Sequence, residues 1–148
     1  MLQYLDSAAV GVGINVKYMN SKESVDTQLN RLTREEDLPT MLISWDIDTS
    51  LTFDQNGVLR NPSANIVALL VIKPETMSDT DIQNAVEQMA VVFTQFIQLL
   101  NSDLNTRVKS DGESPITNAT FKRAPNYGAG KHAGVLGTWT MLKPRETC

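Results

Sequence analysis

The sequence predicts an α+β fold, in which a single mixed or antiparallel sheet of about four to five strands is covered by one long helix. Residues 64–72 are apolar at nearly every position, which is typical of a central strand with both faces covered. Residues 78–101 carry apolar side chains at helical spacing. An Asn56-Gly57 pair between two strand-like runs favours a hairpin turn. Short N-terminal helices and a C-terminal β-hairpin complete the predicted fold.

The N-terminal third predicts small elements. Residues 2–12 show a weak helical spacing that Gly11 interrupts, so we expect a short helix or a partly ordered arm. Residues 14–19 alternate between apolar and polar side chains and predict a short strand. Residues 21–34 begin like a capped helix and predict a short surface helix.

The next segment predicts a long strand and its antiparallel partner. Pro39 favours an extended backbone before it, and residues 40–53 alternate in polarity. The turn at Asn56-Gly57 then allows a second strand, from about Asn65, to pair antiparallel with residues 40–53.

The long predicted helix has an unusually wide apolar face. Ser78 is placed to cap it, and Asp79 and Asp81 suit the positive end of the helix dipole. Its opposite face is polar but has no cation. Three further apolar residues broaden the stripe beyond what one sheet face requires, so we expect them to contact a neighbouring subunit: Val91, Val92 and Leu99.

The C-terminal part predicts a hairpin. Residues 116–123 alternate in polarity, residues 124–131 read as a flexible connection with two glycines, and residues 135–142 predict the final strand.

Length and composition indicate one ordered domain, residues 1–148. The 148 residues are 41% hydrophobic and 20% charged, close to the globular average. The first residues lack the pattern of a signal peptide, and the longest apolar run is far shorter than the roughly 20 residues that cross a bilayer, so we expect a soluble, intracellular protein without membrane contact. The one cysteine, Cys148, excludes an intramolecular disulfide.

Charge is distributed unevenly along the chain. Residues 1–106 hold 14 acidic and six basic side chains, a net of −8, and residues 107–148 hold three acidic and seven basic ones, a net of +4. One interpretation is an ordinary mixed surface. The other is self-association, in which the basic end of one copy meets the acidic body of the next through Arg107, Lys109, Lys122, Arg123 and Lys131.

The glycine-rich and acidic motifs do not meet the requirements of known sites. Residues 128–131 read Gly-Ala-Gly-Lys, but Pro125 and His132 stand where a phosphate-binding loop needs a glycine and a Ser or Thr. Asp46 and Asp48 resemble the start of a calcium loop, yet Leu51 occupies the position that requires glycine. We therefore predict no cofactor and no metal.

The sequence also gives little support for a catalytic or a nucleic-acid-binding function. His132 is the single histidine, so no histidine cluster or triad can form within one chain. Asp46 and Asp48 could pair for hydrolysis, but two acids on an exposed strand face are usually just solvated. The basic residues Arg107, Lys109, Lys122, Arg123 and Lys131, with Phe121 and Tyr127 nearby, could contact a nucleic-acid backbone. The acidic isoelectric point of about 4.9 argues against this function. The sequence predicts no enzyme.

The order of these elements resembles the tail terminator proteins of tailed bacteriophages and prophages. The likeness is one of layout and size and covers most of the chain. It rests on residues 38–43, on residues 67–75, on the long helix ending at residues 96–101, and on the closing β segment to Leu142.

That resemblance implies a structural role in the virion. Such proteins form a ring, usually a hexamer, at the head-proximal end of the tail tube, where they stop tube polymerisation and dock to the connector beneath the capsid. The implied partners are further copies of the chain, the tail tube protein and head–tail connector proteins, with DNA only as cargo in the channel. The implied location is the head–tail junction, after assembly in the host cytoplasm.

Other functions stay open at this stage. The chain could be another head–tail connector ring or a tail-completion component. It could be a small non-viral ligand-binding or enzymatic α+β domain, or a nucleic-acid accessory protein that uses its basic end.

Overall fold

The computed structural model describes seven stretches of the chain: residues 2–19, 39–44, 48–59, 63–72, 78–105, 115–127 and 132–142. The helices are α1 (Leu2–Val12) and α3 (Asp79–Asn105). The strands are β1 (Asn15–Met19), β2 (Thr40–Ser44), β3 (Asp48–Ser50), β4 (Ser63–Ile72), β5 (Ile116–Tyr127) and β6 (His132–Leu142). Along the part of the chain that is described, no helix is long and apolar enough to cross a membrane.

The strands form one mixed sheet in the order β1-β2-β4-β6-β5, with β3 paired beside β2 on the same edge of β4. Among the described strands, β1 and β2 run parallel and the other pairs are antiparallel. The central strand β4 pairs over its whole length with β6, from Ser63 opposite Leu142 to Ile72 opposite Ala133. Strands β1 and β5 therefore lie at the two ends of the strand order.

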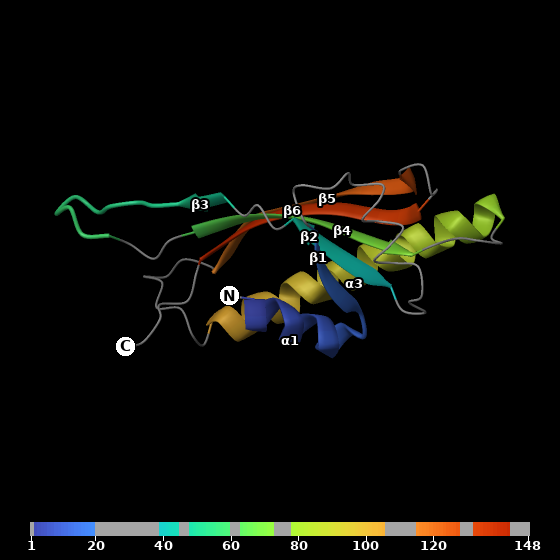
Figure 1. Ribbon diagram of the computed structural model, residues 1–148, viewed down its shortest axis with the longest axis horizontal. Helices are drawn as coiled ribbons and strands as arrows, with labels where there is room; N and C mark the ends of the chain where they lie inside the picture. The colour runs from blue at the N-terminus through green and yellow to red at the C-terminus, as the bar shows by residue number, and fades with distance from the viewer. Residues whose placement is uncertain are drawn as a thin grey trace.

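Both helices cover the same face of the sheet (Figure 1). Helix α3 crosses β5, β6 and β4, and α1 packs beside it and against β1. Because side chains alternate across a strand, every second residue of β4 points at the helices, from Ala64 to Leu70. The main core lies between these layers and contains residues from all the long elements: Leu5, Met41, Ile66, Leu70, Phe96, Leu100, Trp139 and Met141.

The sequence explains the start of α3. The Ser78 hydroxyl accepts a hydrogen bond from the Asp81 backbone N–H at 3.3 Å, which satisfies one of the free donors of the first turn. Asp79 and Asp81 complement the helix dipole there. The exposed face of α3 is polar, as predicted, and carries no cation: Gln83, Asn84, Glu87, Gln88, Thr94, Gln95 and Gln98.

The opposite face of the sheet has an apolar part and a polar part. Leu42, Leu69 and Val71 form a second buried cluster there, with Leu136 packed against it. Further along β4 and β6, and on the neighbouring β5, this face carries polar and mostly exposed side chains: Asn65, Thr117, Thr120, Thr138 and Thr140. Thr120 and Thr138 share a hydrogen bond at 2.9 Å, and the Thr140 hydroxyl donates to Asn65 Oδ1 at 2.7 Å.

The α+β class and the covering long helix are confirmed, but the strand count is wrong. The described part of the chain forms six strands instead of four to five, because the predicted strand over residues 40–53 appears as two pieces, β2 and β3, that both pair with β4. Helix α3 also runs four residues beyond the predicted end at Asn101. The predicted surface helix over residues 21–34 lies outside the described residues.

The C-terminal hairpin is confirmed and is longer than predicted. Strand β5 continues to Tyr127 and β6 begins at His132, so residues 124–127, half of the predicted connection, belong to β5. The register shifts between Ala124 and Tyr127, in a stretch that the sequence pattern assigned to a flexible connection with two glycines. Pro125 lies within this irregularity on the edge strand β5, where the regular ladder is interrupted and a proline is tolerated.

Candidate assembly surfaces

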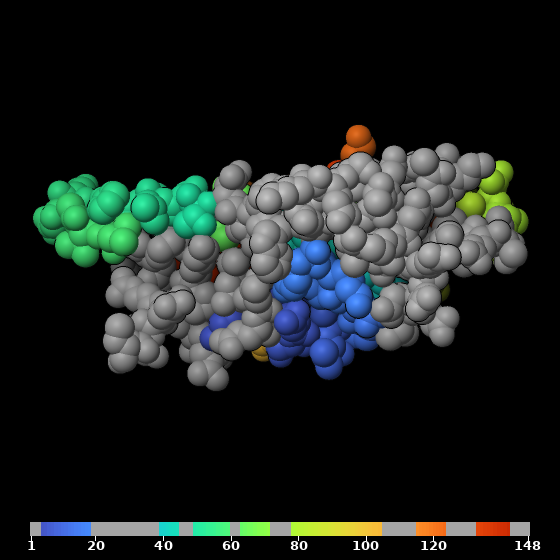
Figure 2. Space-filling view, viewed as in Figure 1, coloured from blue at the N-terminus to red at the C-terminus, as the bar shows by residue number. Residues whose placement is uncertain are grey.

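A narrow β-ribbon projects from one end of the molecule beyond β3 and β4. We call residues 51–59 the arm; Figures 1 and 2 show it extending well clear of the remaining body. An antiparallel bridge joins Phe53 to Leu59. The turn between them is the one that the Asn56-Gly57 pair predicts, and Gly57 takes a φ of 77° that a side chain would strain.

The tip of the arm is held by its own hydrogen bonds. The Asp54 carboxylate accepts hydrogen bonds from the backbone N–H groups of Asn56 and Val58, each at 2.9 Å. The Asp54 N–H donates to the Val58 carbonyl at 2.9 Å, and the Gly57 N–H donates to the Asp54 carbonyl at 3.0 Å. These contacts fix the turn without help from the body of the protein.

The arm exposes large apolar side chains. Leu51 is 59% exposed, Phe53 62%, Val58 59% and Leu59 42%. Phe53 lies opposite Leu59 in the ribbon and two residues after Leu51, so these three share one face. Four such side chains on one projecting ribbon form a larger apolar surface than isolated exposed residues do, and such surfaces usually mark an interaction site.

The three α3 residues predicted to contact a neighbour have different environments. Val91 is 58% exposed. Val92 and Leu99 are half-buried and pack against the main core. A Cβ atom added to Gly11 would overlap the Leu99 side chain, so Leu99 lies in the close contact between α1 and α3.

Of the predicted basic contact residues, Lys122 and Arg123 are described, and they point to opposite faces of the sheet. Lys122 lies opposite Leu136 in the β5–β6 register, and Arg123 lies opposite Val135, so their side chains point to opposite faces. Both are exposed. The other three predicted contact residues, Arg107, Lys109 and Lys131, lie outside the described residues.

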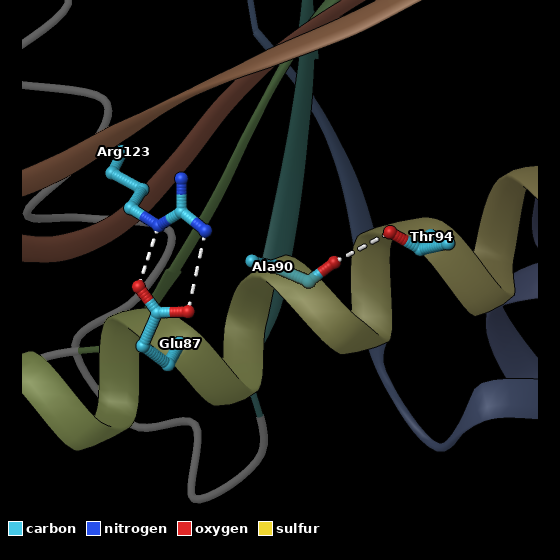
Figure 3. A network of polar contacts seen from close by, with 4 residues as sticks. All are labelled: Glu87, Ala90, Thr94 and Arg123. Carbon is cyan, nitrogen blue, oxygen red and sulfur yellow. Dashed lines mark hydrogen bonds and ion pairs between the residues drawn. The ribbon is translucent and has the colours of Figure 1, made fainter.

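Arg123 joins β5 to α3 through an ion pair with Glu87 (Figure 3). Arg123 Nε donates to Glu87 Oε1 at 2.6 Å, and Nη2 donates to Oε2 at 3.3 Å. This hydrogen bonding lowers the pKa of Glu87 and raises that of Arg123. Both side chains are more than half exposed, so the pair positions β5 over α3 more than it stabilises the fold.

A groove lies between the first turns of α3 and β5 beside this ion pair. Its volume is about 310 Å³, and it is lined by Gln83, Asn84, Val86, Glu87 and Arg123. Val86 is buried and forms its apolar part. The Arg123 guanidinium lies 5.6 Å from the centre of the Phe121 ring, and that ring meets Phe93 edge to face at 5.7 Å.

The residues considered for catalysis and metal binding are not gathered in one place by the described structure. Asp48 begins β3 and His132 begins β6, whereas Asp46 and residues 128–131 lie outside the described residues. Within the described stretches, no group of three or more His, Cys, Asp and Glu could hold a metal ion.

Sequence reasoning missed the arm and the groove as surfaces. The arm had a signal, since Leu51 and Phe53 alternate with polar residues next to an Asn-Gly turn, but alternation does not tell an inward face from a projecting one. The groove had none, because it depends on how α3 crosses β5. No family model and no curated protein matches the sequence.

Proposed function

We propose that the protein is a non-enzymatic structural subunit of a phage virion, which assembles with copies of itself into a ring at the head-proximal end of the tail. In this role it caps the tail tube and joins it to the head–tail connector. The observation that carries the proposal is the arm, whose exposed apolar side chains lie on a hydrogen-bonded ribbon that projects away from the body.

A ring subunit needs two different surfaces, because each copy contacts one neighbour with one face and the next neighbour with another. The arm provides one projecting surface. The exposed Val91 on α3, the threonine-rich sheet face and the uneven charge along the chain provide candidates for others. The layout of sheet, covering helix and final hairpin is the basis of the resemblance to tail terminator proteins.

DNA enters this proposal as cargo. The isoelectric point of about 4.9 suits a channel through which a polyanion slides without binding. Other connector rings and tail-completion proteins would share this property, so the capping reaction distinguishes them.

The test uses purified tail tube protein that polymerises into tubes. Added during polymerisation, the protein should shorten the tubes and appear at one end of them in negative-stain electron micrographs. Added to finished tubes, it should bind an end and leave the length unchanged. Tubes that grow to the same length with bare ends would count against a terminator role.

A second candidate function has one observation in its favour, the groove of about 310 Å³ beside Glu87 and Arg123, which is large enough for a small ligand. A ligand-binding α+β domain would carry a small molecule through native mass spectrometry as a defined added mass. It would also lose that mass on Arg123→Ala.

A further inference from the structure

We infer that Asn56, at the tip of the arm, is a deamidation site, and that Asp54 slows its conversion to aspartate and isoaspartate. The inference concerns the chemistry of the turn and depends on neither the ring nor a partner. Asn56 is the one asparagine in the sequence that a glycine follows. Because glycine has no side chain to hinder its backbone nitrogen, the Asn-Gly pair is the most prone to attack on the asparagine amide.

The surroundings of Asn56 leave room for this reaction. Asn56 and Gly57 are both exposed in the arm, which extends clear of the remaining body (Figure 2). Apart from the two adjacent residues, no described atom lies within 4 Å of the position that a Cβ atom would take on Gly57. Water therefore reaches the Asn56 amide carbon and any ring that forms there.

The reaction exchanges ammonia for water. The Gly57 nitrogen attacks Asn56 Cγ and forms a C–N bond, the Cγ–Nδ2 bond breaks, and Nδ2 leaves as ammonia with the Gly57 amide proton. Water then opens the resulting succinimide ring. Attack at Cγ gives aspartate, whereas attack at the main-chain carbonyl gives isoaspartate, in which the chain continues through the side-chain carboxyl group. No oxidant or reductant takes part.

The hydrogen bonds of the turn oppose the attack. The Gly57 N–H donates to the Asp54 carbonyl at 3.0 Å, so the attacking nitrogen is engaged with Asp54. The Asp54 carboxylate holds the same turn through the N–H groups of Asn56 and Val58, each at 2.9 Å. The turn must open locally before the nitrogen can reach Asn56 Cγ. Each bond that holds it closed therefore lowers the rate of deamidation.

Either product changes the arm. Both add a carboxylate close to Asp54, in a segment, residues 51–59, that contains no cation. Isoaspartate also inserts an extra carbon into the main chain between Phe53 and Leu59, the two residues that the antiparallel bridge joins. Deamidation thus alters the charge and the register of the exposed apolar surface at this end of the molecule.

The test incubates the full-length protein at mildly alkaline pH, digests samples with pepsin in acid to stop the reaction, and measures the peptides by mass spectrometry. The peptide that covers residues 51–59 should gain the mass of an amide-to-acid conversion, and its fragmentation should show both aspartate and isoaspartate. The peptide that contains Asn84, which is exposed on α3 and precedes Ala85, is the internal control and should not change. Protein unfolded in urea lacks the turn and should react fastest.

Three variants identify the site and its restraint. Asp54→Ala removes two hydrogen bonds from the turn and should react roughly tenfold or more faster than the wild type. Gln55→Ala, in the same turn, leaves these bonds in place, so its rate should stay within about twofold of the wild type. Asn56→Gln should show no mass gain in this peptide, because its longer side chain must close a larger ring.

Two results would overturn the inference. If Asp54→Ala reacts at the wild-type rate, Asp54 does not restrain the site. If the peptide covering residues 51–59 stays unchanged in every folded protein while the unfolded chain reacts, Asn56 is not a deamidation site of the folded protein.

Discussion

The Phe93 ring of α3 lies directly over the backbone of Gly137 in β6, where a Cβ atom would overlap it. This contact sets how closely the long helix approaches the sheet. It also lets the Phe93 ring pack edge to face against Trp139, with the ring centroids 5.9 Å apart. The Phe96 ring makes a similar contact with Trp139, with centroids 5.8 Å apart. The absence of a side chain at residue 137 is therefore a packing requirement.

Gly137→Ala should lower the free energy of unfolding by about 1–3 kcal/mol, because the added methyl forces the Phe93 ring out of its packed position. Urea denaturation measures the change. Gly134→Ala should cost more than Gly137→Ala, since its methyl would meet the Leu70 carbonyl and the backbone of β4 rather than a side chain. Equal stability of both variants and the wild type would contradict the helix-to-sheet distance described here.

The same substitution should affect the free energy of unfolding differently at Val91 and at Leu99. Val91→Ser should change the free energy of unfolding by less than about 0.5 kcal/mol, as an exposed position does. Leu99→Ser should lower it by about 1–3 kcal/mol, because Leu99 packs against α1 and the core. Thermal unfolding of the two variants checks the pair, and a large loss on Val91→Ser would contradict the exposed position.

The turn of the arm depends on Asp54. Asp54→Ala removes the acceptor for the backbone N–H groups of Asn56 and Val58, so these amides should exchange hydrogen faster. Mass spectrometry of exchanged peptides covering residues 51–59 measures this change. The melting temperature should stay within about 2 °C of the wild type, because the arm projects from the core. If these amides exchange hydrogen at the wild-type rate, contacts other than those of the Asp54 carboxylate order the tip of the arm.

Tyr18 links stability to alkaline pH. Burial raises the pKa of the Tyr18 hydroxyl above its ordinary value, and the Asp6 carboxylate, which accepts its hydrogen bond at 3.3 Å, adds to the effect. The folded protein thus holds this proton more tightly than the unfolded chain does. The resulting stability is fully present below a pH of about 10 and is lost as the pH rises further.

Tyr18→Phe removes this titration. Its free energy of unfolding should fall less steeply than that of the wild type between about pH 9.5 and 11, measured by urea denaturation at several pH values. Parallel curves for the two proteins would show that Tyr18 titrates in the folded state as it does in the unfolded chain.

Local patterns predicted the elements well where one physical rule decides the outcome. The apolar run of β4, the capped start of α3 at Ser78 and the turn at Asn56-Gly57 depend on burial, capping and a positive φ, which are properties of short sequences. The division into β2 and β3 and the length of β5 were missed, because pairing partners far along the chain determine both.

The surfaces were harder to predict. The sequence shows that α3 carries more apolar residues than one sheet face requires. Only the packing shows that α1 covers Leu99 and that Val91 is exposed. Likewise, adjacent Lys122 and Arg123 read as one basic patch, whereas the strand places them on opposite faces and Glu87 neutralises Arg123.

Native mass spectrometry of the purified protein over a range of concentrations tests the ring most directly. We expect a closed species of about six subunits, each of 16.4 kDa, that forms alone or on addition of tail tubes and does not extend into longer chains. A protein that stays a 16.4 kDa monomer at every concentration, with and without tail tubes, would contradict it.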